Sequence, residues 1–339
     1  MSRSLLSLSF VVSLAATTAS AEVPKVVVDI APVHSLVARV MEGVGTPSLI
    51  VAPGASPHEY SLRPSEAKAL QDADLVFWVS PELTPWLADT IGTLAGEAGE
   101  VVFMDVDGTQ KLPFREGTLF EAHAHGHAEG DDAHHDDADH ANHDDHDDHD
   151  EHEDEHGHEE HAGHDGHDHG EEDPHAWLSP ANGAVWLNEI AAALSAADPE
   201  NANAYFGNAA KGREELAALE TEIDGVLDPV RGGGFIVFHD AYQYFEDAFD
   251  LSAAGAISLS DATDPSPSRI AEIQARVAEQ GVSCVLSEPQ FNAGIVASVM
   301  RGTEVNTGVL DPLGSDLEPG PALYPAMLRN LATALADCL

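Results

Sequence analysis

The stretch KVVVDI at residues 25–30 is an almost continuous run of β-branched residues. Such a run is typical of a strand that is covered on both faces. Further strands are predicted on the C-terminal side of it at residues 48–52, 74–79 and 101–106, and helices at 35–40, 65–71 and 82–94. Strands that alternate with helices indicate βα units and a parallel sheet.

The same alternation returns after Pro229. Strands are predicted at residues 235–238, 254–259, 284–286 and 305–310, and helices at 241–249, 266–280, 293–301 and 321–337. Between the two halves, residues 199–227 are polar on one side and contain no internal proline, which predicts one long helix. We therefore expect an α/β protein with two lobes of parallel sheet joined by that helix. In such sheets, ligands bind beyond the carboxyl ends of the strands.

The charge of the chain is extreme and unevenly distributed. The 339 residues carry a formal net charge of −46, and residues 121–173 alone hold 23 acidic residues and no Lys or Arg. A surface of this kind repels nucleic acid and anionic lipid and attracts cations. Nucleic-acid binding is therefore set aside as a function.

The first 21 residues have the pattern of a cleaved signal peptide. Arg3 precedes a short apolar run, LLSLSFVVSLAA, and Ala19-Ser20-Ala21 is a cleavage pattern, so the mature chain is expected to begin at Glu22. No cysteine near this point could carry a lipid, which predicts a soluble periplasmic protein. An uncleaved anchor or a buried helix is the alternative, and no other stretch is apolar enough to span a membrane.

The chain has two cysteines, Cys284 and Cys338. In an oxidising compartment an even pair predicts one disulfide, here between a strand and the last helix. Two buried free thiols are the alternative.

Four histidines lie outside the acidic run. His58, His175 and His239 are predicted in loops or turns at the ends of strands, and Asp311 also follows a strand. Three imidazoles with a carboxylate or water suit tetrahedral zinc, although imidazole also binds Cu(II), Ni(II) and Fe(II). His34 is predicted in the first turn of a helix and is interpreted as structural.

Several segments together resemble the zinc-specific solute-binding proteins of bacterial ABC importers, the ZnuA type of the cluster A-I (cluster 9) family. They are GASPHEYSLRPSEAKALQDADLVFWVSPELTPWL, DPHAWLSP, FHDAYQYFE, SEPQF and VLDPLG. The resemblance implies two (βα) lobes joined by a rigid backbone helix, with a metal site at the lobe interface. It also implies Zn²⁺ as cargo, a membrane permease with a cytoplasmic ATPase as partner, a monomer without catalytic activity, and a small periplasmic zinc chaperone as a further candidate partner.

Carried over residue by residue, the resemblance makes His58, His175 and His239 metal ligands. Asp311 matches the fourth ligand of some relatives, and Glu59 or a water is the alternative. Some zinc-binding members have a glutamate just before the first histidine, where this chain has Pro57.

The run at residues 121–173 holds sixteen of the twenty histidines and has no apolar periodicity, which predicts disorder. Closely spaced histidines predict weak metal sites that collect zinc for the interlobe site or sense its excess. The alternative is a solvated loop that only adds charge. The candidate residues are His123, His125, His127, His140, His143, His146, His149, His152, His156, His158, His167 and His169.

Three functions compete with zinc import. The first is a zinc hydrolase, because three ligands and an open position also suit a catalytic zinc. Glu59, Asp240 and Glu288 lie near the predicted site, but no motif marks any of them as a general base. The second is a plain metal buffer, and the third is an importer protein for manganese.

Six segments are expected along the chain. They are a signal peptide (1–21), an N-terminal α/β lobe (22–120), the inserted loop (121–173), the last part of that lobe (174–198), the linking helix (199–228) and a C-terminal α/β lobe (229–339).

Overall fold

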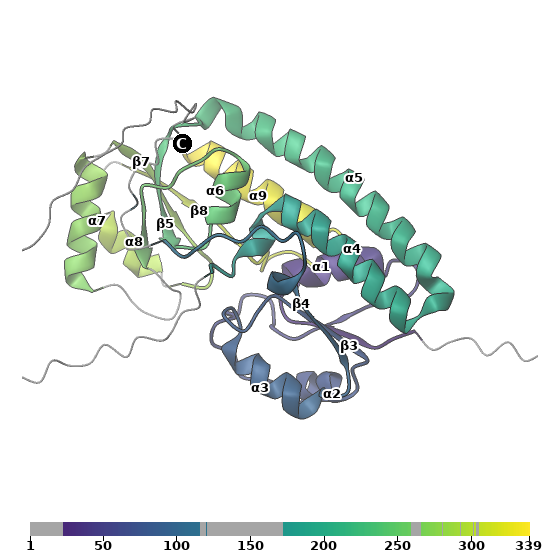
Figure 1. Cartoon of the computed structure of the whole chain (residues 1–339). Coiled ribbons are helices and arrows are strands. Elements are labelled where there is room, and N and C mark those ends of the chain that lie inside the picture. Colours follow the sequence, from purple (N-terminus) through teal and green to yellow (C-terminus); the bar gives the residue numbers. More distant parts are fainter. Residues whose placement is uncertain are drawn as a thin grey trace, which may run out of the picture.

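The computed structural model describes residues 23–115, 120, 172–258, 266–279, 281–291, 293–300, 302 and 305–339. The predicted signal peptide and the weak sites in the acidic run lie outside these residues. Two four-stranded sheets, all of whose neighbouring strands are parallel, form the two lobes seen in Figure 1. The predicted fold class is therefore confirmed.

The N-terminal sheet has the strand order β2-β1-β3-β4. Its two central strands are buried along their whole length, as their continuous apolar sequences predict. The elements of this lobe are β1 (Val26–Val28), α1 (Ala31–Val40), β2 (Ser48–Leu49), α2 (Pro64–Gln71), β3 (Leu75–Trp78), α3 (Pro85–Leu94) and β4 (Gly99–Val102).

The fourth predicted strand, residues 101–106, is wrong in its second half. β4 ends at Val102, and the chain turns into the short 3-10 helix η1 (Phe103–Asp105). There the Phe103 ring is fully buried and stacks 4.7 Å from the ring of Trp186. The apolar residues that suggested a strand instead fill the core beside this tryptophan.

The C-terminal sheet repeats the arrangement with the order β6-β5-β7-β8. Its central strand β5 is buried from Phe235 to His239. The elements of this lobe are β5 (Gly234–His239), α6 (Gln243–Ala248), β6 (Gly255–Ser258), α7 (Pro267–Glu279), β7 (Val282–Ser287), α8 (Ala293–Val299), β8 (Asn306–Val309) and α9 (Leu323–Cys338).

A long helix runs past both lobes (Figure 1). The chain leaves η2 (Ala176–Leu178), passes through α4 (Pro180–Ala197) and η3 (Pro199–Asn201), and enters α5 (Ala202–Leu227), which η4 (Asp228–Val230) follows. α5 packs against α4, α1 and α9, so it contacts helices of both lobes. Two ion pairs add to this packing: Arg39–Glu215 on the N-terminal side and Arg329–Glu222 on the C-terminal side.

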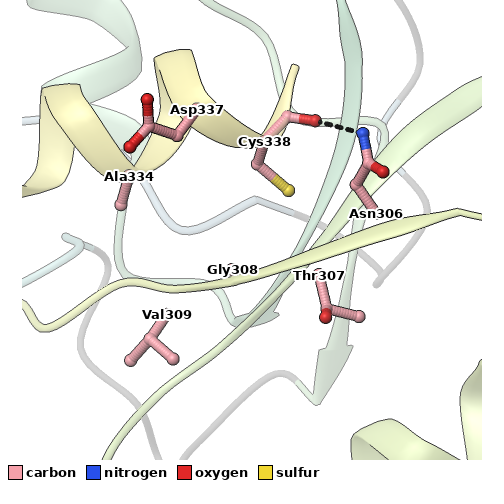
Figure 2. A pocket seen from close by; sticks show the side chains of 7 residues that line it. All are labelled: Asn306, Thr307, Gly308, Val309, Ala334, Asp337 and Cys338. Carbon is pink, nitrogen blue, oxygen red and sulfur yellow. Dashed lines mark hydrogen bonds between the residues drawn. The ribbon is translucent and has the colours of Figure 1, made fainter.

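Cys284 and Cys338 form the predicted disulfide, with their Cα atoms 5.6 Å apart. It joins β7 to the end of α9, so the last helix is covalently attached to the sheet of the C-terminal lobe. Figure 2 shows the neighbouring pocket, where the Asn306 side chain donates a hydrogen bond to the Cys338 carbonyl at 2.9 Å. No candidate metal ligand lines this pocket. In the described part of the chain, no helix has the length and apolarity to cross a membrane.

Candidate metal centre

His239 is the last residue of β5, which lies between β6 and β7 in its sheet. The carboxyl ends of parallel strands are where such sheets bind their ligands. The His239 Nδ1 lies 2.6 Å from Glu288 Oε1, and Glu288 directly follows the neighbouring strand β7. Both side chains are almost fully buried. Because the carboxylate accepts the Nδ1 proton, Nε2 of the neutral ring keeps its lone pair for a metal.

His175 has the same kind of support. Its Nδ1 lies 2.7 Å from Asp173 Oδ1, which also accepts the His175 backbone N–H at 3.0 Å. Burial raises the pKa of Asp173 to about 7. The following helix η2 is fixed to the C-terminal lobe, because the Trp177 indole donates to the Pro312 carbonyl at 2.8 Å and the Tyr324 hydroxyl donates to the Trp177 carbonyl at 2.7 Å.

His58 reaches the site from the loop between β2 and α2 of the N-terminal lobe. The Trp86 indole of α3 donates a hydrogen bond at 2.8 Å to the carbonyl of Pro57, the residue before His58, and this bond holds the loop in place. The His58 backbone N–H donates to Ser56 Oγ at 3.2 Å. His58 is only partly buried, whereas His175 and His239 are buried.

The three imidazoles converge between the lobes. Each offers one ring nitrogen, and these nitrogens all lie within 4.8 Å of one another. The ring centroids of His58 and His175 are 5.5 Å apart, and those of His175 and His239 are 5.3 Å apart. Three imidazole nitrogens at these separations match the preference of Zn²⁺ for nitrogen ligands in a tetrahedral site.

Neither carboxylate considered for the fourth position belongs to this group. The Asp311 carboxylate accepts backbone N–H groups of its own loop, from Leu313 at 3.0 Å, Gly314 at 2.9 Å and Ser315 at 2.6 Å. Glu59 is exposed to solvent. The structure therefore brings three of the five candidate ligands together, and the Asp311 oxygens are used to shape a turn.

His34 lies in the first turn of α1 and is buried away from this group. Its Nε2 hydrogen-bonds to the Pro47 carbonyl at 3.1 Å, and burial lowers the pKa of its imidazole. This environment agrees with a structural role.

Buried carboxyl groups lie around the three imidazoles. Asp173, Asp240, Glu246 and Glu288 are each at most 5% exposed, and Arg115, whose side chain is 11% exposed, pairs with Asp240 and Glu246. Burial raises the pKa of Asp240 to about 6, although Arg115 acts in the opposite direction. The charges of these carboxylates favour a divalent cation at the site.

Sequence reasoning missed Asp173 and Arg115 as supports of the site. The Asp-Pro-His order could have indicated Asp173, because a carboxylate two residues before a metal-binding histidine can reach its ring. Arg115 had no such signal, since its partner Asp240 is 125 positions away along the chain. Glu288 was expected only as a nearby carboxylate, and the structure gives it a specific partner in His239.

Comparison with known proteins places the chain in a family. The profile described as "Zinc-uptake complex component A periplasmic" matches residues 26–338. The chain belongs to this family. Its members are solute-binding proteins of zinc uptake rather than enzymes.

Two relatives and one solved structure illustrate the similarity. The "High-affinity zinc uptake system protein ZnuA" of Brucella abortus (strain 2308) is 47% identical over 331 residues, which are 98% of this chain and 96% of the relative. The protein of the same name from Paracoccus denitrificans (strain Pd 1222) is 47% identical over 326 residues, 96% and 94% of the two chains. The solved structure "Crystal structure of ZnuA" has a TM-score of 0.69 at 18% identity and covers 94% of this chain and 99% of its own, which supports the fold.

Proposed function

We propose that this protein binds Zn²⁺ between its lobes through His58, His175 and His239 and delivers it to the membrane permease of an ABC importer, which a cytoplasmic ATPase drives. The convergence of three ring nitrogens within 4.8 Å carries the proposal. Zinc uptake by two relatives at 47% identity supports the choice of cargo.

The ligand set favours zinc over manganese. Mn²⁺ prefers carboxylate, carbonyl and water oxygens, whereas three imidazoles suit zinc. The Asp311 carboxylate would have to break its hydrogen bonds to Leu313, Gly314 and Ser315 before it could bind a metal. A water in the fourth position requires no such change, so we assign that position to water in the proposed complex.

The same contacts argue against hydrolysis at this site. A zinc hydrolase needs a general base that can reach the metal-bound water. Among the described residues, three buried carboxylates near the imidazoles are already bonded: Asp173 to His175, Glu288 to His239 and Asp240 to Arg115. They are placed to orient side chains rather than to accept a proton from water.

The remaining parts of the proposal concern export and assembly. The family description places these proteins in the periplasm. We infer cleavage of the signal peptide before Glu22, a soluble monomer without a lipid anchor, and delivery to a permease partner. Receipt of zinc from a small periplasmic chaperone is a further part of the same proposal.

Competition titrations with a zinc chelator test the site. His58→Ala, His175→Ala and His239→Ala each remove one ligand and should weaken the tightest Zn²⁺ binding by about 10-fold or more. His34→Ala is the matched control, since that imidazole is also buried but lies outside the group. Unchanged binding in the His239 variant would exclude this site.

The acidic run is proposed to collect zinc for this site. Replacing residues 121–171 by a short Gly-Ser linker keeps the flanking residues Phe120 and Glu172. Calorimetry should then show one tight site, with the weaker binding lost. Slower filling of the tight site from a chelator supports collection, and an equal rate would favour sensing of excess zinc or a charge-only role.

A further inference from the structure

The chain forms a short two-stranded connection where it enters and leaves the acidic run. The Asp173 N–H donates to the Leu112 carbonyl at 2.8 Å, and Pro113 and Glu172 form an antiparallel bridge. This connection is built from described residues that precede the run and from those at its C-terminal end. We call residues 110–115 and 172–175 the neck.

One hydroxyl group of the C-terminal lobe bonds both strands of the neck. The Tyr244 hydroxyl accepts the Leu112 N–H at 2.9 Å and donates to the Asp173 carbonyl at 2.7 Å. Tyr244 lies in α6 and is 1% exposed. The bond to Asp173 is buried and the bond from Leu112 is partly buried, so losing the hydroxyl would take a partner from two backbone groups that water reaches poorly.

Arg115 makes the second attachment of the neck to this lobe. Its guanidinium donates to Asp240 at 2.9 Å and to Glu246 at 2.8 Å, and it stacks 3.8 Å from the centre of the Phe120 ring. Asp240 and Glu246 are 4% and 5% exposed. Two buried carboxylates therefore depend on one cation, and removing it would leave them unpaired.

Both attachments end beside a metal ligand. Asp173 of the neck accepts the Nδ1 proton of His175. Asp240, the partner of Arg115, directly follows His239 at the end of β5. Hydrogen bonds and short stretches of backbone, Leu112 to Arg115 and His239 to Asp240, thus connect the His175 and His239 ends of the site without passing through α5.

We propose that Arg115 and Tyr244 are positioning residues for the metal site, which hold His175 and His239 in a fixed relation through the neck. This inference rests on the proposed function. A site whose ligands come from separate elements loses affinity when those elements must be ordered during binding. The neck supplies that order in advance, so it belongs to the metal site although none of its residues except His175 binds the metal.

The test compares Arg115→Gln and Tyr244→Phe with Arg39→Gln in the full chain. Arg39 is similar to Arg115 in its own burial, with a side chain 13% exposed against 11%, and it also contacts two carboxylates, Glu42 and Glu215, although these are exposed. Its pair with Glu215 joins α1 to α5, and neither Arg39 nor its partners belong to the group of three imidazoles.

Supports of metal ligands typically change metal affinity by about 10- to 100-fold when they are removed. Arg115→Gln should weaken zinc binding within that range, and Tyr244→Phe by about 10-fold. Arg39→Gln should leave zinc affinity unchanged. Both neck variants should also alter the visible absorption of bound Co²⁺, which reports ligand geometry, and Arg115→Lys should restore part of the affinity.

Tyr244→Phe keeps the test valid if Arg115→Gln does not fold, because it removes a single oxygen atom. Wild-type affinity and an unchanged Co²⁺ spectrum in the folded neck variants would overturn the inference. If the His175→Ala and His239→Ala variants bind weakly in that case, the proposed metal site still stands. If those two variants also bind zinc as tightly as the wild type, the proposed metal site itself is wrong, whatever the neck variants show.

Discussion

The two lobes have the same strand order, but different residues stand at the carboxyl ends of the equivalent strands β1 and β5. In the C-terminal lobe, His239 ends β5 and bonds to Glu288, which follows the neighbouring strand β7. In the N-terminal lobe, Asp29 follows β1 and accepts the N–H of Val79, which follows the neighbouring strand β3, at 2.8 Å. One lobe has the proposed metal ligand His239 where the other has the buried Asp29.

This difference explains why the third imidazole comes from a loop. With Asp29 at the end of β1 of the N-terminal sheet, that lobe contributes His58 from the segment after the two-residue strand β2. His239 is fixed by a strand and a buried carboxylate, whereas His58 is partly buried. We infer that the C-terminal lobe determines the geometry of the site and that the N-terminal loop completes it.

The largest expected change in stability comes from removing the disulfide of the C-terminal lobe. Replacing Cys284 and Cys338 together by Ala should lower the free energy of unfolding by about 2–5 kcal/mol, the usual loss for a native disulfide. Urea unfolding of the metal-free protein measures it. An unchanged unfolding midpoint would contradict the prediction, as would two titratable thiols in the unreduced, unfolded protein.

In the N-terminal lobe, the buried Asp29 should make the stability of the protein depend on pH. Burial raises the pKa of Asp29 to about 7, while an unfolded aspartate has a pKa of about 3.9. Between these values the folded protein holds a proton that the unfolded chain has released. The contribution of Asp29 to stability is therefore greatest at low pH and decreases as the pH rises towards 7.

The Asn variant isolates this contribution. From pH 5 to pH 7, the free energy of unfolding of the wild type should fall by about 2 kcal/mol relative to Asp29→Asn. Denaturant titrations at several pH values give this difference. A constant difference across that interval would show that Asp29 has no raised pKa.

A smaller effect compares two of the proposed ligand histidines, His239 and His58, in the absence of metal. His239→Ala removes one hydrogen-bond partner of the buried Glu288 and should cost about 1–3 kcal/mol of stability. His58→Ala removes a partly exposed side chain and should change stability by about 0.5 kcal/mol or less. Equal losses in thermal or urea unfolding would contradict the different support of the two residues.

The two sheets, the three histidines of the candidate site and the disulfide could be predicted from the sequence. Continuous apolar strands alternating with helices predicted two parallel sheets, because this pattern has few other solutions. His58, His175 and His239 could be chosen because metal-binding residue types at strand ends are uncommon and their motifs resemble those of a known family. The disulfide followed from an even cysteine count and the predicted export.

Other features depend on tertiary contacts that no local pattern records. Phe103 lies in an apolar run but leaves the strand, because its ring packs on Trp186. Asp311 has the residue type and strand-end position of a ligand, yet its oxygens accept the N–H groups of the following turn. Arg115 becomes part of the site only because the chain folds it against Asp240.

Anomalous diffraction at the zinc edge, from crystals of the zinc-loaded protein, tests the central claim most directly. We predict one strong zinc peak between the lobes, about 2.0–2.1 Å from one ring nitrogen each of His58, His175 and His239. Water in the fourth position and unbroken hydrogen bonds from Asp311 to its own turn are part of that prediction. The absence of a zinc peak among these three imidazoles, with a strong peak elsewhere, would contradict it.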